Sequence, residues 1–175
     1  MRTVSACIFS LLALSACAIP AKKDGESLTL TKVEKIEWSK MSQPVLLKQI
    51  GSPDKKAMIG PQGEEEVWIY LGGEPRSTRL SVIFNAKTSQ LLSANWFFRS
   101  NDPGTELKDI FNRYNQYEFT LEPEESYSTS RMQFYKSKNG DLELAVNKKS
   151  GDVNSISWEV VPEAASSSKR KPTSH

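Results

Sequence analysis

The side chains that most often carry chemistry in proteins are scarce in this sequence. His175 is the only histidine and the last residue, and the two cysteines, Cys7 and Cys17, lie close to the N-terminus. A Ser-His-Asp or Cys-His catalytic set and a histidine-based metal site therefore cannot be built from this sequence. The densest carboxylates, at 64–66 and 122–125, lack the ligand spacing of a calcium loop, and we interpret them as solvated loops. We predict a protein that is not an enzyme and has no metal and no cofactor.

Large aromatic residues are the remaining candidates for function. Residues 67–71, VWIYL, read as a strand whose three aliphatic side chains suffice for a core face, which leaves Trp68 and Tyr70 on the other face. Tyr135 repeats Tyr70 in a later segment. Aromatic residues are usually core, but the sequence offers each half of the chain one short helix, enough to cover a single sheet face. We therefore predict that Trp68 and Tyr70 are at least partly exposed and that they form a partner-binding site with Tyr135.

The N-terminus has the pattern of a secretory signal. Arg2 precedes a mostly apolar run, residues 4–14, which is too short to span a bilayer. The run ends in LSAC, whose last residue is Cys17, and this resembles the lipobox of bacterial lipoproteins, in which the cysteine accepts diacylglycerol. Cys7 lies too early to be the acceptor. The alternative is an ordinary secretory signal with a coincidental cysteine.

The lipobox reading has consequences for location. A Cys17 thiol that carries lipid cannot form a disulfide, bind a metal or act as a nucleophile, and several acyl chains on one residue anchor a protein stably. Ala18 replaces the aspartate that marks inner-membrane retention in enteric lipoproteins. We therefore predict a lipid-anchored protein on the periplasmic face of the outer membrane.

Composition is that of a globular domain with a modest core. Hydrophobic residues make up 38% and charged residues 25%, and the formal net charge is only +2. Both signs of charge are interspersed along the chain, which does not produce the basic footprint of a nucleic-acid-binding protein.

One hairpin-like stretch occurs twice. Residues 80–96 and 142–158 share five identities without a gap, and both read as an alternating strand, a polar turn and a second strand that ends in tryptophan. Ser89 stands in the first turn where Gly151, suited to a left-handed conformation, stands in the second. The sequence therefore predicts an internal duplication.

Each half of the chain has the same order of predicted elements. Residues 42–51 form a helix candidate, and apolar spacing at 107–114 predicts a second helix with Asp102 as its cap. A strand and a hairpin follow each helix, while residues 55–66 and 118–130 read as loops. Residues 28–38 allow either a strand or a helical turn.

These elements predict an α+β fold of two tandem helix-plus-three-stranded antiparallel sheet repeats. The two halves can cover each other or join into one sheet. The predicted divisions are a signal peptide (1–16), a lipidated tether (17–27), a first repeat (28–100), a second repeat (101–161) and a disordered basic tail (162–175).

The first half resembles a known family. Met41-Ser42, Ile50-Gly51-Ser52-Pro53, Trp68-Ile69-Tyr70 and Leu80-Ser81-Val82-Ile83-Phe84 follow one another as in the small lipoproteins of the BamE (SmpA/OmlA) family. The resemblance covers roughly residues 40–96 and implies a helix packed on three strands. For the family member BamE it implies an accessory of the outer-membrane β-barrel assembly machine. Lys40 replaces the family's glycine and Asn85 its usual aspartate, and the doubled layout resembles the β-lactamase-inhibitor fold.

We therefore expect a protein-binding module tied to the membrane by its N-terminal lipid. Its partner would be an envelope protein, with barrel-assembly subunits as the candidates that the resemblance implies, and not a nucleic acid. An enzyme-inhibitor or ligand-binding lipoprotein on the same scaffold is the first alternative. A carboxylate-based hydrolase of the envelope is the second.

Overall fold

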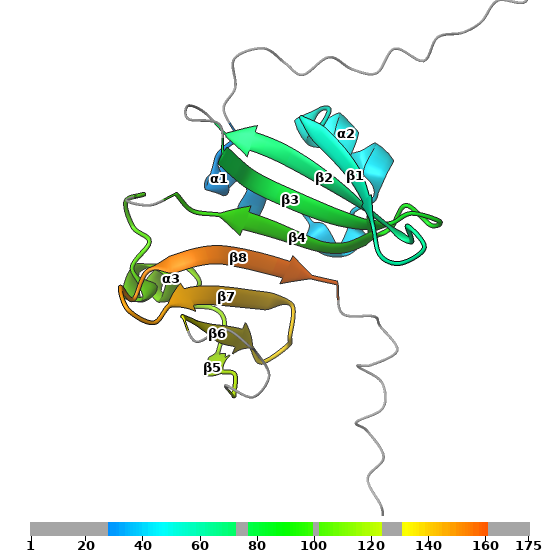
Figure 1. The fold of residues 1–175 in the computed structure, drawn as a ribbon. Coiled ribbons are helices and arrows are strands. Elements are labelled where there is room, and N and C mark those ends of the chain that lie inside the picture. The colour runs from blue at the N-terminus through cyan, green and yellow to red at the C-terminus, as the bar shows by residue number, and fades with distance from the viewer. Residues whose placement is uncertain (1–27, 73–76, 100–101, 124–130, 161–175) are drawn as a thin grey trace, which may run out of the picture.

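Eight antiparallel strands form one continuous sheet in the order β1-β2-β3-β4-β8-β7-β6-β5 (Figure 1). The computed structural model describes residues 28–72, 77–99, 102–123 and 131–160. The strands are β1 (Lys55–Ile59), β2 (Glu65–Gly72), β3 (Ser77–Asn85), β4 (Leu91–Phe97), β5 (Phe119–Leu121), β6 (Met132–Ser137), β7 (Leu142–Asn147) and β8 (Val153–Glu159). The two halves of the chain meet where β4 pairs with β8.

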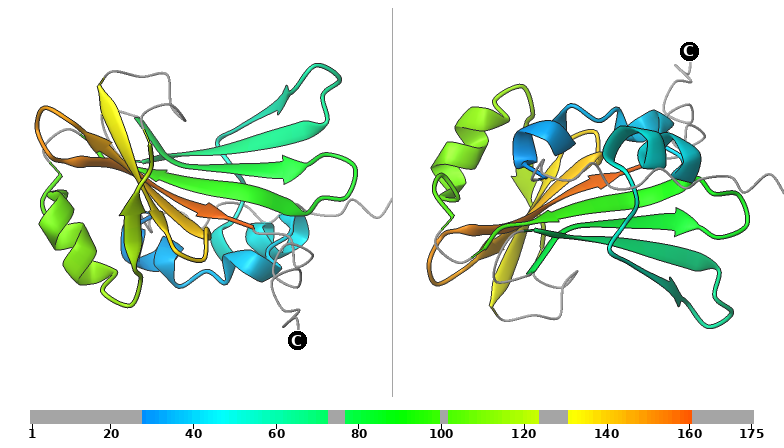
Figure 2. Two further views of the ribbon diagram at one scale, coloured as in Figure 1. Left: turned by 90° about the horizontal axis from the view of Figure 1, so that it is seen from below. Right: turned by 90° about the horizontal axis from the view of Figure 1, so that it is seen from above.

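The described helices are short and lie on one side of the sheet (Figure 2). They are α1 (Leu30–Glu34), the 3-10 turn η1 (Trp38–Lys40), α2 (Gln43–Ile50) and α3 (Leu107–Arg113). The Thr29 hydroxyl caps α1 by accepting from the Lys32 backbone N–H, and Gly51 ends α2 with a φ of 82°. None of these helices is long and apolar enough to cross a bilayer.

The core is the layer between the helices and the sheet. The side chains that alternate onto the helix-facing side of β2, β3, β4, β7 and β8 are almost all buried. They form one cluster under α1, η1 and α2 and a second under α3. Leu30, Phe98 and Trp158 pack against both clusters, so the core is continuous across the junction of the halves.

The two predicted hairpins have the same topology and register. Leu80 lies opposite Trp96 in β3–β4, and Leu142 lies opposite Trp158 in β7–β8. The pairing register of each hairpin shifts by one residue at the equivalent place, after Ile83 in the first hairpin and after Ala145 in the second. The prediction that these two stretches are structurally equivalent is confirmed.

The turns agree in detail as well. The Asn85 side-chain oxygen accepts two backbone N–H groups, from Lys87 and Thr88, and Asn147 repeats this pattern in the second turn. Ser89 and Gly151 both adopt left-handed backbone conformations, with φ of 57° and 77°. Their carbonyls accept the N–H of the first residue of α2 and of α3 respectively, at 3.2 and 3.3 Å. Each hairpin turn therefore fixes the start of the helix in its own half.

The predicted fold class is wrong in its architecture. The strands do not form two helix-plus-three-stranded repeats. They form one eight-stranded sheet with little helix, so the two halves join into one sheet instead of covering each other. Each half contains a further strand, β1 or β5, in a segment that was expected to be a loop. Both are edge strands with few buried side chains, so their sequences lack the apolar alternation by which strands are recognised.

Candidate functional site

Two residues of the predicted partner-binding site are core residues. Trp68 is 1% exposed and Tyr70 is 3% exposed, and both lie on the helix-facing side of β2. The prediction that they are exposed is wrong. Val67, Ile69 and Leu71, which alternate with these aromatics and were expected to form the core face, point to the opposite side and are half-buried.

Polar contacts explain how these aromatics are accommodated in the core. The Trp68 indole N–H donates to the Glu66 carboxylate at 2.9 Å, and the Tyr70 hydroxyl donates to the Gly51 carbonyl at 3.2 Å. The Trp68 ring also packs edge-on against Phe84, with 5.0 Å between ring centroids. Burial, with a smaller effect of the Asp54 charge, raises the pKa of Tyr70. Because both donors are satisfied, the larger aromatic side chains fill the core at little polar cost.

Tyr135 also faces the helices but is half-buried. It lies opposite Leu144 in the β6–β7 ladder and packs edge-on against Phe111 of α3 at 5.5 Å. Val82, which lies opposite Trp68, corresponds to Leu144 in the second hairpin. Tyr135 therefore occupies the position of Trp68 and not that of Tyr70. The structure therefore does not gather the three aromatics on a partner-binding surface. The predicted lipidation site, Cys17, lies outside the described residues.

The face of the sheet that no described helix covers carries an aliphatic patch. Ala57, Val67 and Ile83 lie side by side across β1, β2 and β3. Ile59, two residues after Ala57 on β1, and Ile69, two residues after Val67 on β2, point to the same face of the sheet. Ile59 is 40% exposed, and the patch reaches the free edge of the sheet at β1, whose five residues are all exposed. We call Ala57, Ile59, Val67, Ile69 and Ile83 the aliphatic patch.

The same face becomes polar towards the second half. The Ser157 hydroxyl donates to the Asn95 side-chain oxygen at 2.6 Å across the β4–β8 pair. Next to it the Lys136 ammonium lies 3.3 Å from the Glu159 carboxylate. This polar strip limits the aliphatic patch to the β1–β3 side of the open face.

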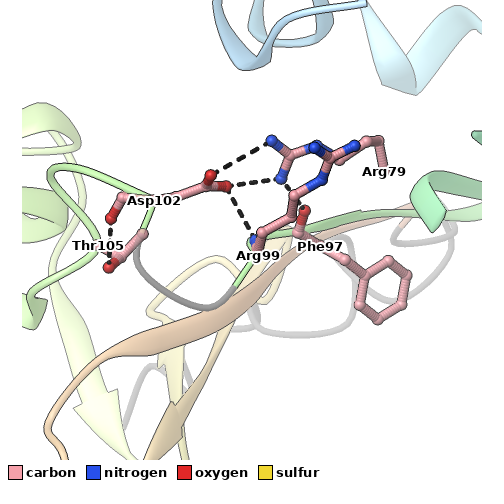
Figure 3. Close-up of polar contacts among 5 residues, drawn as sticks. All are labelled: Arg79, Phe97, Arg99, Asp102 and Thr105. Atoms are coloured by element: carbon pink, nitrogen blue, oxygen red, sulfur yellow. Dashed lines mark hydrogen bonds and ion pairs between the residues drawn. The ribbon is translucent and has the colours of Figure 1, made fainter. Parts of the chain in front are cut away.

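The junction between the halves holds an ion pair that sequence reasoning missed. The Arg79 guanidinium at the start of β3 donates to the Asp102 carboxylate at 2.6 and 3.4 Å and to the Phe97 carbonyl at 3.2 Å (Figure 3). Asp102 also accepts the Arg99 backbone N–H, while its carbonyl accepts the Thr105 hydroxyl. Asp102 was expected to cap the second helix, but α3 begins only at Leu107. No local pattern links two residues so far apart in sequence.

A second polar contact ties α1 to α3. The Glu34 carboxylate accepts from the Arg113 guanidinium at 2.6 and 2.5 Å and from the Tyr114 hydroxyl at 2.5 Å. Partial burial opposes ionisation of Glu34, but these donors outweigh it and lower its pKa. Asp102 behaves alike, because hydrogen bonds from Arg79 and the Arg99 N–H outweigh its burial and lower its pKa. Both carboxylates are therefore fixed negative charges at neutral pH.

Within the described residues, no group of three or more histidine, cysteine or carboxylate side chains is close enough to hold a metal ion. Comparison with known proteins adds little. No protein-family model and no curated protein matches the chain. Among solved structures, a cysteine-rich secretory protein from Staphylococcus aureus is similar over 70% of this chain and 44% of its own, with 11% identity and a TM-score of 0.39. The chain thus spans less than half of that protein, and so weak a likeness supports no inference. The resemblance to BamE stays a prediction.

Proposed function

We propose that this chain is a lipid-anchored envelope protein that binds another protein through the open face of its sheet and catalyses no reaction. The aliphatic patch is the observation that carries the proposal. Apolar side chains kept in contact with water contribute nothing to stability, whereas a contiguous group at a sheet edge is suited to a partner. The lipobox at Cys17 supports the anchor.

The geometry of β1 favours a partner that adds a strand. The Asp54 N–H donates to the Ile69 carbonyl, so the backbone groups of Ile69 face β1. Lys55 lies opposite Ile69 in the register, and backbone direction alternates along a strand. The backbone groups of Lys56 and Met58 therefore point to the free edge, where an extended segment can pair while its side chains cover the aliphatic patch.

Site-specific crosslinking tests the proposal. A photoreactive amino acid at Ala57, an exposed residue of the aliphatic patch on β1, should form adducts with an envelope protein. One at Leu121, on the opposite edge strand β5 and 56% exposed, should not. Equal crosslinking from both positions would show that contact is not specific to the aliphatic patch.

Two substitutions sharpen the test. Ile59→Asp places a charge in the patch, and Val45→Asp places the same charge on α2 at nearly equal exposure, 40% against 41%. Both should change stability by less than about 0.5 kcal/mol, but only Ile59→Asp should reduce adduct formation, at least tenfold. Met58→Pro should also abolish the adduct, because it removes a free-edge N–H and leaves the β1–β2 ladder intact.

The anchor is tested separately. Cys17→Ser removes the only thiol of the lipobox, so the variant should leave the membrane fraction when membranes are washed without detergent. Retention equal to the wild type would refute lipid anchoring and leave the open-face proposal standing.

A further inference from the structure

The free edge of the sheet at β1 has a sequence that is complementary to itself. Its two lysines, Lys55 and Lys56, stand at the start of the strand, and Met58 and Ile59 stand at the end. When a strand pairs with a second copy of itself in antiparallel orientation, the start of one copy lies next to the end of the other. The basic end of β1 then meets the apolar end, and no lysine has to face a lysine.

One register of such a pair suits both the backbone and the side chains. The backbone groups of Lys56 and Met58 point to the free edge, so a two-fold axis at Ala57 lets Lys56 of each copy exchange hydrogen bonds with Met58 of the other. An axis at Lys56 would place this lysine opposite itself, where like charges repel. An axis at Met58 would carry Lys55 and Lys56 past the end of the other strand, which stops at Ile59. The axis at Ala57 alone pairs the whole of β1.

The same register completes a charge pair that the single chain leaves open. Lys55 and Glu65 point to the open face, and neither side chain has a hydrogen bond or ion pair in the described part of the chain. Ile59 lies opposite Glu65 within one copy, and Lys55 of the second copy would lie opposite Ile59 on its other side. The lysine and the glutamate are then two strand spacings apart, about 10 Å between backbones. Their extended side chains can span this distance and form an ion pair over Ile59.

Pairing also joins the two aliphatic patches. The row of Ile83, Val67 and Ala57 reaches the axis, so it continues into the same row of the second copy. Ile59 of each copy is covered by the apolar stem of Lys55 from the other. Apolar side chains that face water in the single chain therefore gain neighbours in the pair.

The opposite edge of the sheet lacks this complementarity. Backbone hydrogen bonds to β6 turn the backbone groups of Glu118 and Glu122 inward, so those of Phe119 and Leu121 face the free edge of β5. An antiparallel pair of β5 strands about Thr120 would place Glu118 opposite Glu122 at both ends, where like charges repel. We therefore expect self-pairing at β1 and not at β5.

We propose that two copies of this chain pair β1 with β1 about a two-fold axis at Ala57 and form one continuous sheet when no other protein occupies this edge. The inference rests on the proposed function, because the second copy covers the same edge and the same aliphatic patch. An envelope protein that adds a strand must displace the second copy. Self-pairing thereby regulates the site and protects an otherwise exposed sheet edge.

Disulfide trapping tests the position of the axis, in a chain whose own cysteines, Cys7 and Cys17, are replaced by serine. Ala57→Cys would face its own copy at a pair without hydrogen bonds, where Cα atoms are about 4.5 Å apart and within reach of a disulfide. Mild oxidation should convert most of this variant to a covalent dimer. Lys55→Cys, also exposed but about 14 Å from its own copy, should form little dimer alone and should form a mixed dimer with Ile59→Cys.

Thr120→Cys supplies the matched control on the other edge, because Thr120 is exposed and lies at the centre of β5. It should stay monomeric under the same oxidation. If Ala57→Cys gives no more dimer than Lys55→Cys or Thr120→Cys, the proposal is overturned.

A charge exchange tests the register without a covalent bond. Lys55→Glu and Glu65→Lys should each weaken self-association at least about fivefold in sedimentation velocity, because each brings like charges together in both halves of the interface. The double variant Lys55→Glu/Glu65→Lys should recover the wild-type association to within about twofold. A double variant as weak as the single ones would refute the ion pair and with it this register.

The dimer and the proposed function can fail separately. Photocrosslinks from Ala57 to an envelope protein, without disulfides from Ala57→Cys, would overturn the dimer and leave the proposed function standing. Disulfides from Ala57→Cys, with photocrosslinks only between copies of this chain, would support the dimer and refute the proposed function.

Discussion

The two halves of the sheet share a hairpin but differ in what fills the space above it. The first half packs three helical segments on an aromatic core that includes Trp38, Trp68, Tyr70 and Trp96. The second half has one helix over a mostly aliphatic core, in which Tyr114 is buried and the other aromatic residues of the cluster are partly exposed. Hairpin geometry is therefore set locally by turn residues, whereas the volume of the core depends on how much helix each half provides.

The largest expected difference lies at the equivalent positions Trp68 and Tyr135. Trp68→Ala should reduce the free energy of unfolding by about 3–5 kcal/mol, because it empties a fully buried site. Tyr135→Ala should cost only about 1–2 kcal/mol, since that side chain is not fully buried. Urea unfolding of both variants measures the difference. Equal losses would mean that the two halves bury their cores to the same depth.

The hairpin turns should respond with opposite signs to exchange of their left-handed residues. Gly151→Ser forces a side chain into a backbone conformation that costs about 1 kcal/mol, although nothing lies within 4 Å of the added Cβ. Ser89→Gly relieves the same strain and should stabilise the first turn by a few tenths to about 1 kcal/mol. Thermal unfolding of the two variants and of the double exchange checks this. A loss of stability from Ser89→Gly would contradict the equivalence of the turns.

The smallest effect is expected at the contact between the halves. The folded-state pKa of Asp102 lies below its ordinary value of 3.8, so the unfolded chain binds more protons than the folded chain at a pH near and below this value. The stability that Asp102 contributes is therefore lost as the pH is lowered. Asp102→Asn should cost up to about 1 kcal/mol at neutral pH, because the ion pair is partly exposed. The difference from wild type should shrink as the pH drops below about 4. A difference that stayed constant down to pH 2 would exclude the carboxylate charge as its cause.

Local patterns in the sequence predicted local structure well. Ser42 and Gly51 correctly bounded α2, and the alternation in residues 80–96 correctly placed β3 and β4 with their turn. The choice of face in β2 failed, because Val67, Ile69 and Leu71 alternate as regularly as Trp68 and Tyr70. Only the larger area that aromatic side chains bury favoured Trp68 and Tyr70 as the core face. The strand β1 was missed because none of its side chains is buried.

The candidate sites were largely beyond prediction for a related reason. The aliphatic patch follows from the register of three strands, and the contact of Arg79 with Asp102 depends on how the halves meet. Pairing of β4 with β8 brings together residues 62 positions apart, for example Asn95 and Ser157. No spacing within a single element encodes such a contact.

The central position of β8 has a consequence for the order of folding. Among the described strands β8 is synthesised last, yet it fills the middle of the sheet between β4 and β7. Until it arrives, the first half has an unpaired edge at β4, and β7 lacks a neighbour on the side that faces it. Closing the sheet then requires contacts between distant parts of the chain, which form slowly. A newly made chain therefore passes through a stage with exposed strand edges, when it is most prone to pair with the wrong partner.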